Sequence, residues 1–496
     1  MLALFQQALR HGHRSAIRDD HGTYSYAELL RASELLAFAL LNGKADLAEG
    51  PVAFLVNPGF DYVKTQWAIW QAGGVAVPIF LQAPIASIQY TLEDTGAAIM
   101  IVSPEYSATV NLCSQLGVRC ISLDNVPESK PVSLPDVQVS RRAMILYTSG
   151  TTSQPKGVVT THHNIEAQIT TLVSAWEWAA DDHTLCVLPL HHVHGIINVI
   201  GCSLWAGACC EFISQFSAQG VFNIFNKQEV NVFMAVPTIY FKLITHWESL
   251  SAEEQTALKR TMSAFRLMVC GSAALPASVM DKWYDISTHR LLERYGMTEI
   301  GMGISNPYRR ERKTGYVGLP LPGVQVRLCD DENKLVTGEP GEVQVKGDNV
   351  FKEYWQRPTE TAAAFTSDGW FRTGDVAETD SEGYYKILGR KSQDIIKSGG
   401  YKISALEIEE VLRQHPNIKD ASVIGLPDDE WGERIAAALV TDQSIDEVAL
   451  DAWLRTRLSK YKMPRKFLVL SDFPRNAMGK VVKNELKNLF LKGSEK

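Results

Sequence analysis

Short apolar runs that end in small or turn-forming residues recur along the first three hundred residues. Residues 52–56 precede Asn-Pro-Gly, 99–102 precede Ser-Pro, 232–236 precede Pro-Thr, and 267–269 precede Cys-Gly-Ser. Runs of this length, bounded by turn residues, are typical of buried parallel strands. The segments between them are long enough for crossover helices, and residues 26–41 carry apolar side chains at helical spacing. The pattern predicts a large α/β body.

The amino-acid composition and the pattern of apolar residues change near residue 315. Gly- and Pro-rich turns there separate the alternating runs 324–328 and 342–346, which predict a small β-barrel. Residues 405–413 then predict a helix, with Ser404 and Glu407 forming a capping box and Pro416 following its end, and 421–425 a buried strand. The polar residues 390–393 interrupt an apolar stretch, so we expect an N-terminal domain over 1–389, with its β-rich part at about 315–389, and an α+β C-terminal domain over 390–496.

A polar loop follows the apolar run 143–146, which predicts a short buried strand. Residues 147–157 read Tyr-Thr-Ser-Gly-Thr-Thr-Ser-Gln-Pro-Lys-Gly. Glycine lets backbone N–H groups turn toward an anion, hydroxyls add donors, and Lys156 supplies a point charge, so the loop is typical of a phosphate site rather than an ordinary surface turn. It is not a Walker A loop, because Pro155 precedes the lysine and Gly157 follows it.

Composition narrows the class of protein. With 496 residues, 45% of them hydrophobic, and a net charge of -7, the chain has no basic field for nucleic acid or anionic membrane. No apolar run approaches the roughly 20 residues of a membrane helix, and no signal peptide is evident, so the expected compartment is the cytoplasm, with an organellar matrix left open. The eight cysteines form no C-x-x-C pair, which favours reduced thiols over disulfides or zinc.

A second cluster, residues 294–299, reads Arg-Tyr-Gly-Met-Thr-Glu. An aromatic ring, a glycine, a hydroxyl and a carboxylate this close together can stack a base, approach a phosphate and hold Mg²⁺, although a strand end with ordinary turn residues is the alternative. With the phosphate loop, the cluster resembles motifs of the acyl-adenylate-forming superfamily of acyl-CoA synthetases, peptide-synthetase adenylation domains and luciferases. Further motifs follow in the same order at 370–375, 389–390, 397–402 and 474–480.

The resemblance implies roles for individual residues. Tyr295 is expected against adenine, Thr298 at the α-phosphate, Glu299 on Mg²⁺, Asp375 on the ribose hydroxyls, and Lys480 as the catalytic lysine between the acyl carboxylate and the α-phosphate. Arg390 is expected to assist at the ribose or phosphate. The remaining residues that the resemblance places around ATP and coenzyme A are Thr148, Ser149, Gly150, Thr151, Thr152, Lys156, Gly271, Ser272, Ala273, Gly296, Met297, Lys397, Ser398, Gly399 and Gly400.

The same resemblance implies a two-step reaction. A carboxylate attacks the α-phosphorus of ATP to give an acyl-adenylate and pyrophosphate, and the thiol of coenzyme A then displaces AMP. The C-terminal domain is expected to be mobile and to rotate between the steps, presenting the Gly399-Gly400 turn to the thiol, although the pair also suits a plain hairpin turn. Ser392 stands at the hinge position, where the family commonly has Asp or Lys.

The acid is suggested by three further residues. His194, in the cluster 189–195, matches the family's gate to the acyl pocket. A metal site is the less favoured alternative, because the cluster contains no Cys or carboxylate to complete one. Arg294 is either exposed, paired with Glu293, or a ligand for a second carboxylate. The surrounding residues look most like malonyl-CoA synthetases, which implies that Arg294 and Ser272, with His194 and Met297, hold malonate or methylmalonate.

Three alternatives stay open from the sequence. The chain could be a short- or medium-chain acyl-CoA ligase, an adenylation enzyme that loads a carrier protein, or a nucleotide-binding regulatory protein. Retention of Lys156, Glu299, Asp375 and Lys480 together disfavours the last.

Overall fold

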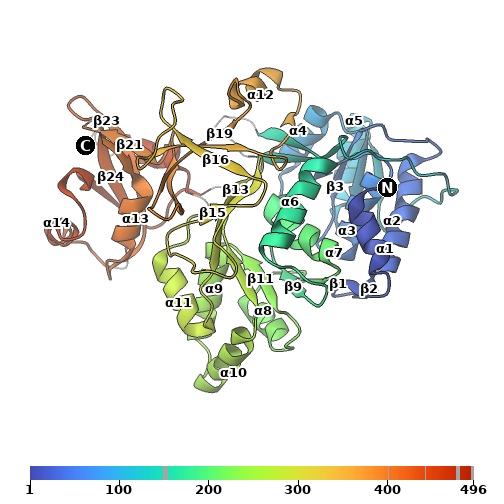
Figure 1. Ribbon diagram of the computed structural model, residues 1–496, viewed down its shortest axis with the longest axis horizontal. Helices are drawn as coiled ribbons and strands as arrows, with labels where there is room; N and C mark the ends of the chain where they lie inside the picture. Colours follow the sequence, from blue (N-terminus) through green and yellow to red (C-terminus); the bar gives the residue numbers. More distant parts are fainter. Residues whose placement is uncertain (149–154, 400, 442, 476–480, 493–496) are drawn as a thin grey trace.

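The computed structural model describes residues 1–148, 155–399, 401–441, 443–475 and 481–492. Six residues with predicted roles lie outside this part of the chain: Ser149, Gly150, Thr151, Thr152, Gly400 and Lys480. Figure 1 shows the α/β sheets and their helices at the right and bottom, a β-rich part in the middle and the C-terminal strands at the left. The predicted fold class, a large α/β part followed by a smaller α+β part, is confirmed.

A seven-stranded sheet carries the phosphate-loop segment. Its strand order is β18-β8-β7-β4-β3-β5-β6, and β7, β4, β3, β5 and β6 are parallel, as the apolar runs predict. The two remaining strands, β8 and β18, add antiparallel pairs at one edge. The strands are β3 (Pro51–Leu55), β4 (Val75–Pro78), β5 (Ile99–Val102), β6 (Arg119–Ser122), β7 (Arg142–Thr148), β8 (Lys156–Thr161) and β18 (Glu353–Tyr354). The helical segments that connect them are α3 (Phe60–Gln71), α4 (Ile85–Thr95), η1 (Pro104–Tyr106) and α5 (Ala108–Leu116).

A nine-stranded sheet carries the second motif. Its order is β15-β14-β13-β12-β11-β9-β10-β1-β2, with a parallel centre and antiparallel pairs at both edges. The strands are β1 (Ser15–Asp19), β2 (Gly22–Ser25), β9 (His183–Cys186), β10 (Cys209–Phe212), β11 (Val232–Ala235), β12 (Leu267–Cys270), β13 (Leu292–Met297), β14 (Gly301–Ser305) and β15 (Leu319–Pro320). The helices around it are α1 (Ala3–Arg10), α2 (Tyr26–Leu41), α6 (His162–Ala175), η2 (His194–Gly201), α7 (Cys202–Ala206), α8 (Ala218–Phe225), α9 (Pro237–Glu248), α10 (Ala252–Ser263) and α11 (Ala277–Ser287).

One continuous apolar core joins these two sheets. It contains Phe54 of β3, Trp67 of α3, Leu146 of β7, Val269 of β12 and Leu292 of β13, all almost fully buried. Because both sheets share this core, the ends of β7, β12 and β13 are held in a fixed relation to one another. Helix α2 begins and ends as the sequence predicts, and its N-terminus has a full capping box with Ser25.

The β-rich part from about residue 315 contains a four-stranded antiparallel sheet, in the order β16-β17-β19-β20. It lies between the α/β sheets and the C-terminal strands in Figure 1. Strands β19 and β20 are paired so that Asp375 lies opposite Arg390. The elements are β16 (Gln325–Cys329), β17 (Gly341–Lys346), α12 (Pro358–Ala364), β19 (Phe371–Thr379) and β20 (Tyr385–Arg390).

The C-terminal part has its own five-stranded sheet and its own core, which includes Ile408, Leu412, Val423 and Leu439. The elements are β21 (Ile395–Ser398), β22 (Tyr401–Ser404), α13 (Ala405–Arg413), β23 (Ile418–Asp428), β24 (Gly432–Thr441), α14 (Glu447–Arg455), η3 (Lys460–Lys462), β25 (Lys466–Leu470) and α15 (Lys483–Lys492).

Helix α13 has the predicted bounds but only half of the predicted capping box. Ser404 Oγ accepts a hydrogen bond from the backbone N–H of Glu407. The Glu407 carboxylate instead accepts hydrogen bonds from Lys462 Nζ at 2.6 and 2.7 Å. A tertiary ion pair has therefore replaced the local bond that the sequence spacing predicts.

Candidate active site

The phosphate-loop segment connects two antiparallel strands. Strand β7 ends at Thr148 and β8 begins at Lys156, so the lysine stands on a strand, paired opposite Thr148. The predicted loop thus leaves a strand end, as expected. The base of this hairpin is anchored by Tyr147, whose hydroxyl donates to Asp94 Oδ2 at 2.6 Å, and by Tyr90, whose hydroxyl donates to the carbonyl oxygen of Pro155 at 2.9 Å. These bonds fix where the loop starts and ends.

Tyr354 brings the phosphate-loop lysine to the second motif. Lys156 Nζ lies 5.4 Å from the centre of the Tyr354 ring, and the Tyr354 hydroxyl donates to Glu299 Oε1 at 2.9 Å. Strand β18 holds the tyrosine there by pairing Tyr354 with Val158 of β8. The chain that results, ammonium, phenol and carboxylate, suits a polyphosphate with its counter-cation. No motif marks Tyr354 in the sequence.

Glu299 has the character of a cation ligand. It is 6% exposed, and burial raises the pKa of its carboxyl group. A nearby divalent cation would favour the charged carboxylate and offset that burial. Among the described residues no group of three or more His, Cys, Asp or Glu side chains could hold a metal by itself. The donor set therefore fits Mg²⁺ held by one carboxylate, water and substrate phosphates, which is the usual arrangement in nucleotide sites.

The turn that bears Glu299 follows β13 closely. Met297 ends the strand, Thr298 and Glu299 lie in the turn to β14, and Thr298 is half-buried. Gly296 permits this tight return, because a Cβ atom there would lie 2.0 Å from the carbonyl oxygen of Gly301. The structure therefore requires glycine at the position that the sequence motif places beside phosphate.

Tyr295, Asp375 and Arg390 meet at one point. The Tyr295 hydroxyl donates to Asp375 Oδ2 at 2.5 Å, and Arg390 Nε lies 3.0 Å from Asp375 Oδ1. Arg390 also donates to the carbonyl oxygen of Thr373 at 3.0 Å. Asp375 is 7% exposed, and a carboxylate with two acceptor oxygens is suited to bind ribose hydroxyls. The fold brings together three residues that the sequence separates by up to 95 positions.

Arg294 is a buried guanidinium at the end of the predicted acyl pocket. It is 3% exposed, and burial lowers its pKa to about 10. Its Nη2 donates to Ser272 Oγ at 3.3 Å, while its Nε has no hydrogen-bond partner among the residues that the structure describes. No carboxylate in the described ranges forms an ion pair with it. The alternative that Arg294 is exposed is therefore wrong.

Glu293 does not neutralise Arg294. Consecutive strand residues point to opposite faces, and the Glu293 carboxylate accepts from the backbone N–H of Gly315 at 3.3 Å. Burial raises the pKa of Glu293 to about 8. The predicted alternative of a Glu293–Arg294 pair is wrong for this geometric reason.

Ser272 links Arg294 to His194. Its Oγ lies 3.2 Å from His194 Nδ1, and its backbone φ is +71°, an unusual conformation for a residue other than glycine. The preceding Gly271 makes room for the guanidinium, because a Cβ atom there would lie 2.5 Å from Arg294 Cζ. Ala273 is exposed and Met297 half-buried. Three residues predicted to hold the acid are thus in contact, while adenine contacts of the segment 271–273 stay a prediction.

The segment 397–399 forms the predicted hairpin turn between β21 and β22. Lys397 donates its backbone N–H to Glu433 Oε2 at 2.7 Å, and Gly399 donates to the carbonyl oxygen of Trp431 at 2.9 Å. Gly399 has φ +56°, and a Cβ atom there would lie 2.8 Å from the Trp431 ring. Ser398 is buried. The turn is therefore packed against β24, and its role toward a thiol stays a prediction.

The connection around Ser392 is short and anchored on both sides. Lys391 Nζ lies 2.9 Å from Asp331 Oδ1 and 3.1 Å from Glu342 Oε2, and Asp394 Oδ2 accepts the backbone N–H of Arg390 at 2.9 Å. No motif in the sequence marks the Lys391 contacts. They tie the connection to the β-rich part.

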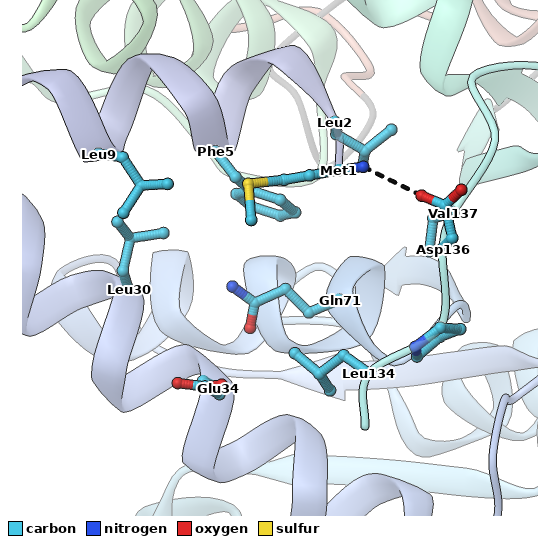
Figure 2. A pocket seen from close by; sticks show the side chains of 11 residues that line it. Met1, Leu2, Phe5, Leu9, Leu30, Glu34, Gln71, Leu134, Asp136 and Val137 are labelled. Atoms are coloured by element: carbon cyan, nitrogen blue, oxygen red, sulfur yellow. Dashed lines mark hydrogen bonds and ion pairs between the residues drawn. The ribbon is translucent and has the colours of Figure 1, made fainter. Parts of the chain in front are cut away.

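A separate pocket of about 360 Å³ lies between α1, α2, α3 and residues 134–137 (Figure 2). Its lining is mainly apolar, with Gln71 and Glu34 among the polar members, and it contains none of the predicted site residues. The predicted site is therefore defined by side-chain contacts rather than by this pocket.

The fold brings residues of the nucleotide-binding motifs together and buries the Arg294 guanidinium beside Ser272 and His194. The chain belongs to the AMP-binding enzyme family: the family profile matches residues 4–355, and the profile of its C-terminal domain matches 407–480. Among the described residues no helix is long and apolar enough to cross a membrane.

The relatives agree on the class of enzyme. The chain is 43% identical to the mitochondrial malonate–CoA ligase ACSF3 of Bos taurus, over 97% of this chain and 89% of the relative. It superposes on ATP-bound MatB from Rhodopseudomonas palustris with a TM-score of 0.90 and 32% identity, covering 99% of each chain. It also resembles o-succinylbenzoate coenzyme A synthetase of Bacillus subtilis in complex with ATP and magnesium, with a TM-score of 0.86 and 28% identity over 98% and 99% of the chains. The protein is an AMP-forming acyl-CoA ligase.

Proposed function

We propose that the protein is a malonate–CoA ligase that forms malonyl-CoA, or methylmalonyl-CoA, through an acyl-adenylate. One malonate carboxylate attacks the α-phosphorus of ATP, and the bond to the β-phosphate oxygen breaks to release pyrophosphate. The thiolate of coenzyme A then attacks the acyl carbon, and AMP leaves. Malonate–CoA ligase relatives of similar length support this assignment.

Arg294 is the residue that would determine specificity for a dicarboxylic acid. A guanidinium that is 3% exposed and has only a serine hydroxyl as partner among the described side chains is costly to bury. A second carboxylate on the substrate would supply the missing counter-charge and could accept two parallel N–H donors. A monocarboxylate with an apolar tail would leave the charge unpaired, so the site disfavours acetate and octanoate.

The same contacts support the proposed roles at the nucleotide end of the site. Lys156 would offset charge on the β- and γ-phosphates, Tyr295 would line the adenine, and Asp375 would accept hydrogen bonds from the ribose. Glu299 would hold Mg²⁺, which supplies further neutralisation of the polyphosphate when bound. Thr298 lies at the turn that would face the α-phosphate. Lys480, outside the described residues, is proposed to stabilise charge at the acyl oxygen and α-phosphate.

The second half-reaction is assigned to the C-terminal part. The proposed domains are residues 1–389 and 390–496, with rotation at Ser392, and Gly399 with its neighbours would face the pantetheine thiol. The tethers of Lys391 to Asp331 and Glu342 would have to break or move in such a rotation. They support a hinge with a preferred position.

The setting of the enzyme is part of the proposal. Malonyl-CoA is a thioester that fatty acid metabolism uses, and its synthesis requires ATP, Mg²⁺ and coenzyme A in one compartment. The cytoplasm or an organellar matrix meets that requirement, and four relatives are named as mitochondrial enzymes. Fractionation of cells that express the full-length protein distinguishes the two compartments.

The acid specificity can be tested with Arg294→Met. We expect malonate-dependent pyrophosphate release to fall on the order of a thousandfold or more, because a buried carboxylate would lose its charged partner. Release with 3-methylbutyrate, in which an isopropyl group replaces the distal carboxylate, should be retained or rise. Arg312→Met is the matched control, since burial also lowers the pKa of Arg312, but its guanidinium donates to the backbone carbonyls of Arg290 and Tyr308.

Two results would count against the proposal. Wild-type enzyme that uses 3-methylbutyrate as efficiently as malonate would remove the argument for a dicarboxylate. Equal losses in Arg294→Met and Arg312→Met would show that the first change acts through the fold. Replacing coenzyme A by a holo-carrier protein tests the carrier-loading alternative, and the ligase assignment predicts turnover with coenzyme A alone.

A further inference from the structure

Asn198 is a buried amide that the reaction described above does not use. It is 0% exposed, and neither Nδ2 nor Oδ1 has a hydrogen-bond partner among the described residues. Every other residue of η2 after His194 is apolar: Gly195, Ile196, Ile197, Val199, Ile200 and Gly201. Buried amides are almost always hydrogen-bonded in folded proteins, because leaving one unpaired is costly. An amide that is unpaired on both atoms therefore points to a ligand.

The helix geometry places Asn198 on the side of His194. Residues 194–201 form a π-helix, whose hydrogen bonds join residues five apart, so residues four or five apart lie one turn along the same face. The His194 side chain on that face reaches Ser272 Oγ at 3.2 Å, and Ser272 in turn contacts Arg294. Asn198 thus lies one helical turn after His194, on the same face of η2 as this proposed acid-binding residue.

The contacts also indicate which atoms of these side chains can donate. The guanidinium of Arg294 can only donate, so Ser272 Oγ accepts from its Nη2. If the Ser272 hydroxyl donates to His194 Nδ1, the proton of a neutral imidazole lies on Nε2. Burial, with Arg294 nearby, lowers the pKa of His194 well below its usual range and keeps the ring neutral.

With His194 in this tautomer, three donors of these side chains have no hydrogen-bond partner among the described residues. They are Arg294 Nε, His194 Nε2 and Asn198 Nδ2. A carboxylate accepts hydrogen bonds only, so a set of donors matches it in sign and in hydrogen-bonding character. An apolar tail of a monocarboxylate would leave all three unpaired.

We infer that Asn198 is a specificity-determining residue, whose amide N–H donates to the distal carboxylate of the substrate beside the Nε2–H tautomer of His194. The inference rests on the proposed function and deepens it, because it extends the acid site from the ends of β12 and β13 along η2. It also explains why a polar side chain stands in the middle of an apolar π-helix.

Asn198→Leu tests this role through acid preference and stability together. We expect kcat/KM for malonate to fall by on the order of tenfold to a hundredfold, the scale of a hydrogen bond to a charged group. The KM for ATP should stay unchanged, and kcat/KM for 3-methylbutyrate should stay unchanged or rise. The urea midpoint should not fall, because no internal hydrogen bond is lost. Asn198→Ala gives the same comparison without added volume if leucine disturbs packing.

Asn306→Leu is the matched control. Asn306 is also buried, but its amide donates to the carbonyl oxygens of Glu293 and Tyr316 and accepts from the backbone N–H of Lys313. This variant should lose stability while its preference for malonate over 3-methylbutyrate is retained. The opposite pattern, a less stable Asn198→Leu with an unchanged preference, would overturn the inference.

The tautomer of His194 has its own test. His194→Gln places an amide nitrogen near the position of Nε2, whereas His194→Asn places one near Nδ1. We expect the glutamine variant to retain more malonate turnover than the asparagine variant, and the reverse order would overturn the tautomer. Wild-type enzyme without malonate turnover would overturn the proposed function and this inference with it. Malonate turnover that survives Asn198→Leu and Asn198→Ala unchanged would overturn the inference alone.

Discussion

Arg294→Met should stabilise the free protein while it abolishes malonate activity. Burial of its guanidinium lowers the pKa of Arg294 to about 10, and a shift of that size corresponds to about 3 kcal/mol of unfavourable free energy for the charged form. The hydrogen bond to Ser272 is the contact that the substitution removes, and a bond from a charged group contributes about 1.5 to 3 kcal/mol. The difference predicts a gain in unfolding free energy of up to about 1.5 kcal/mol.

The sign of this effect follows from linkage. A cation whose pKa is lower in the folded state than in the unfolded state destabilises the fold at every pH below the folded pKa, and the penalty disappears only as the pH rises above about 10. The full penalty therefore applies at pH 7. Methionine has no charge to desolvate and fills a similar volume, so the penalty is removed without a large cavity.

Urea unfolding at pH 7, followed by tryptophan fluorescence, measures the change. We expect Arg294→Met to unfold at a higher urea concentration than the wild type, and Arg312→Met at a lower one, since Arg312 loses two hydrogen bonds to backbone carbonyls. Malonate with an ATP analogue should then raise the midpoint of the wild type but not of Arg294→Met. A fall in the midpoint of Arg294→Met comparable to that of Arg312→Met would refute the reasoning, because it would mean that the guanidinium is satisfied in the free protein.

Three further predictions concern the nucleotide end and the hinge. Tyr354→Phe removes a hydrogen bond that favours the charged form of Glu299, so the pKa of Glu299 should rise further. The acid limb of the pH profile of kcat/KM for ATP should then move to higher pH, with a loss of about tenfold at pH 7. An acid limb that does not move would contradict the contact between Tyr354 and Glu299. Lys480→Ala should slow adenylation by at least about a hundredfold in pyrophosphate release, and an unchanged rate would remove Lys480 from the mechanism. Ser392→Pro should impair at least one half-reaction, measured separately as pyrophosphate release and as thioester formation from preformed acyl-adenylate; both intact would place the rotation elsewhere.

Much of the fold was predictable because the strands are uniform apolar runs. Residues 99–102 are buried on both faces of a parallel sheet, so hydrophobicity alone gives their bounds. Helix α2 combines a helical period with a Ser-x-x-Glu start, and both ends agree with the sequence. Local signals of this kind do not depend on distant parts of the chain.

The parts that were missed depend on distant contacts. Glu407 has the right spacing for a capping box, but Lys462, 55 residues later, binds its carboxylate. Tyr354 reaches Glu299 because β18 pairs with β8, and no local pattern reveals that pairing. Asn198 stands out only once the structure shows that it is buried and unpaired. The candidate site was predicted by motif resemblance, whereas the contacts within it required the fold.

The same distinction applies to Arg294. The sequence is compatible with three states of Arg294: exposed to solvent, paired with Glu293, or available to bind a ligand. The alternation of β13 decides among these, because it turns Glu293 toward Gly315 and Arg294 toward Ser272. The carboxyl group of Glu293 and the guanidinium of Arg294 are thereby kept on opposite faces of one strand.

The central claim is that a buried cation selects a dicarboxylic acid. A competition experiment tests it most directly: equimolar malonate, methylmalonate, acetate and octanoate are mixed with ATP, Mg²⁺ and coenzyme A, and the thioesters are quantified by mass spectrometry. We predict that malonyl-CoA and methylmalonyl-CoA exceed acetyl-CoA and octanoyl-CoA on the order of 10⁴-fold, the discrimination available when unpaired buried polar groups reject a substrate. Comparable amounts of acetyl-CoA or octanoyl-CoA would contradict it.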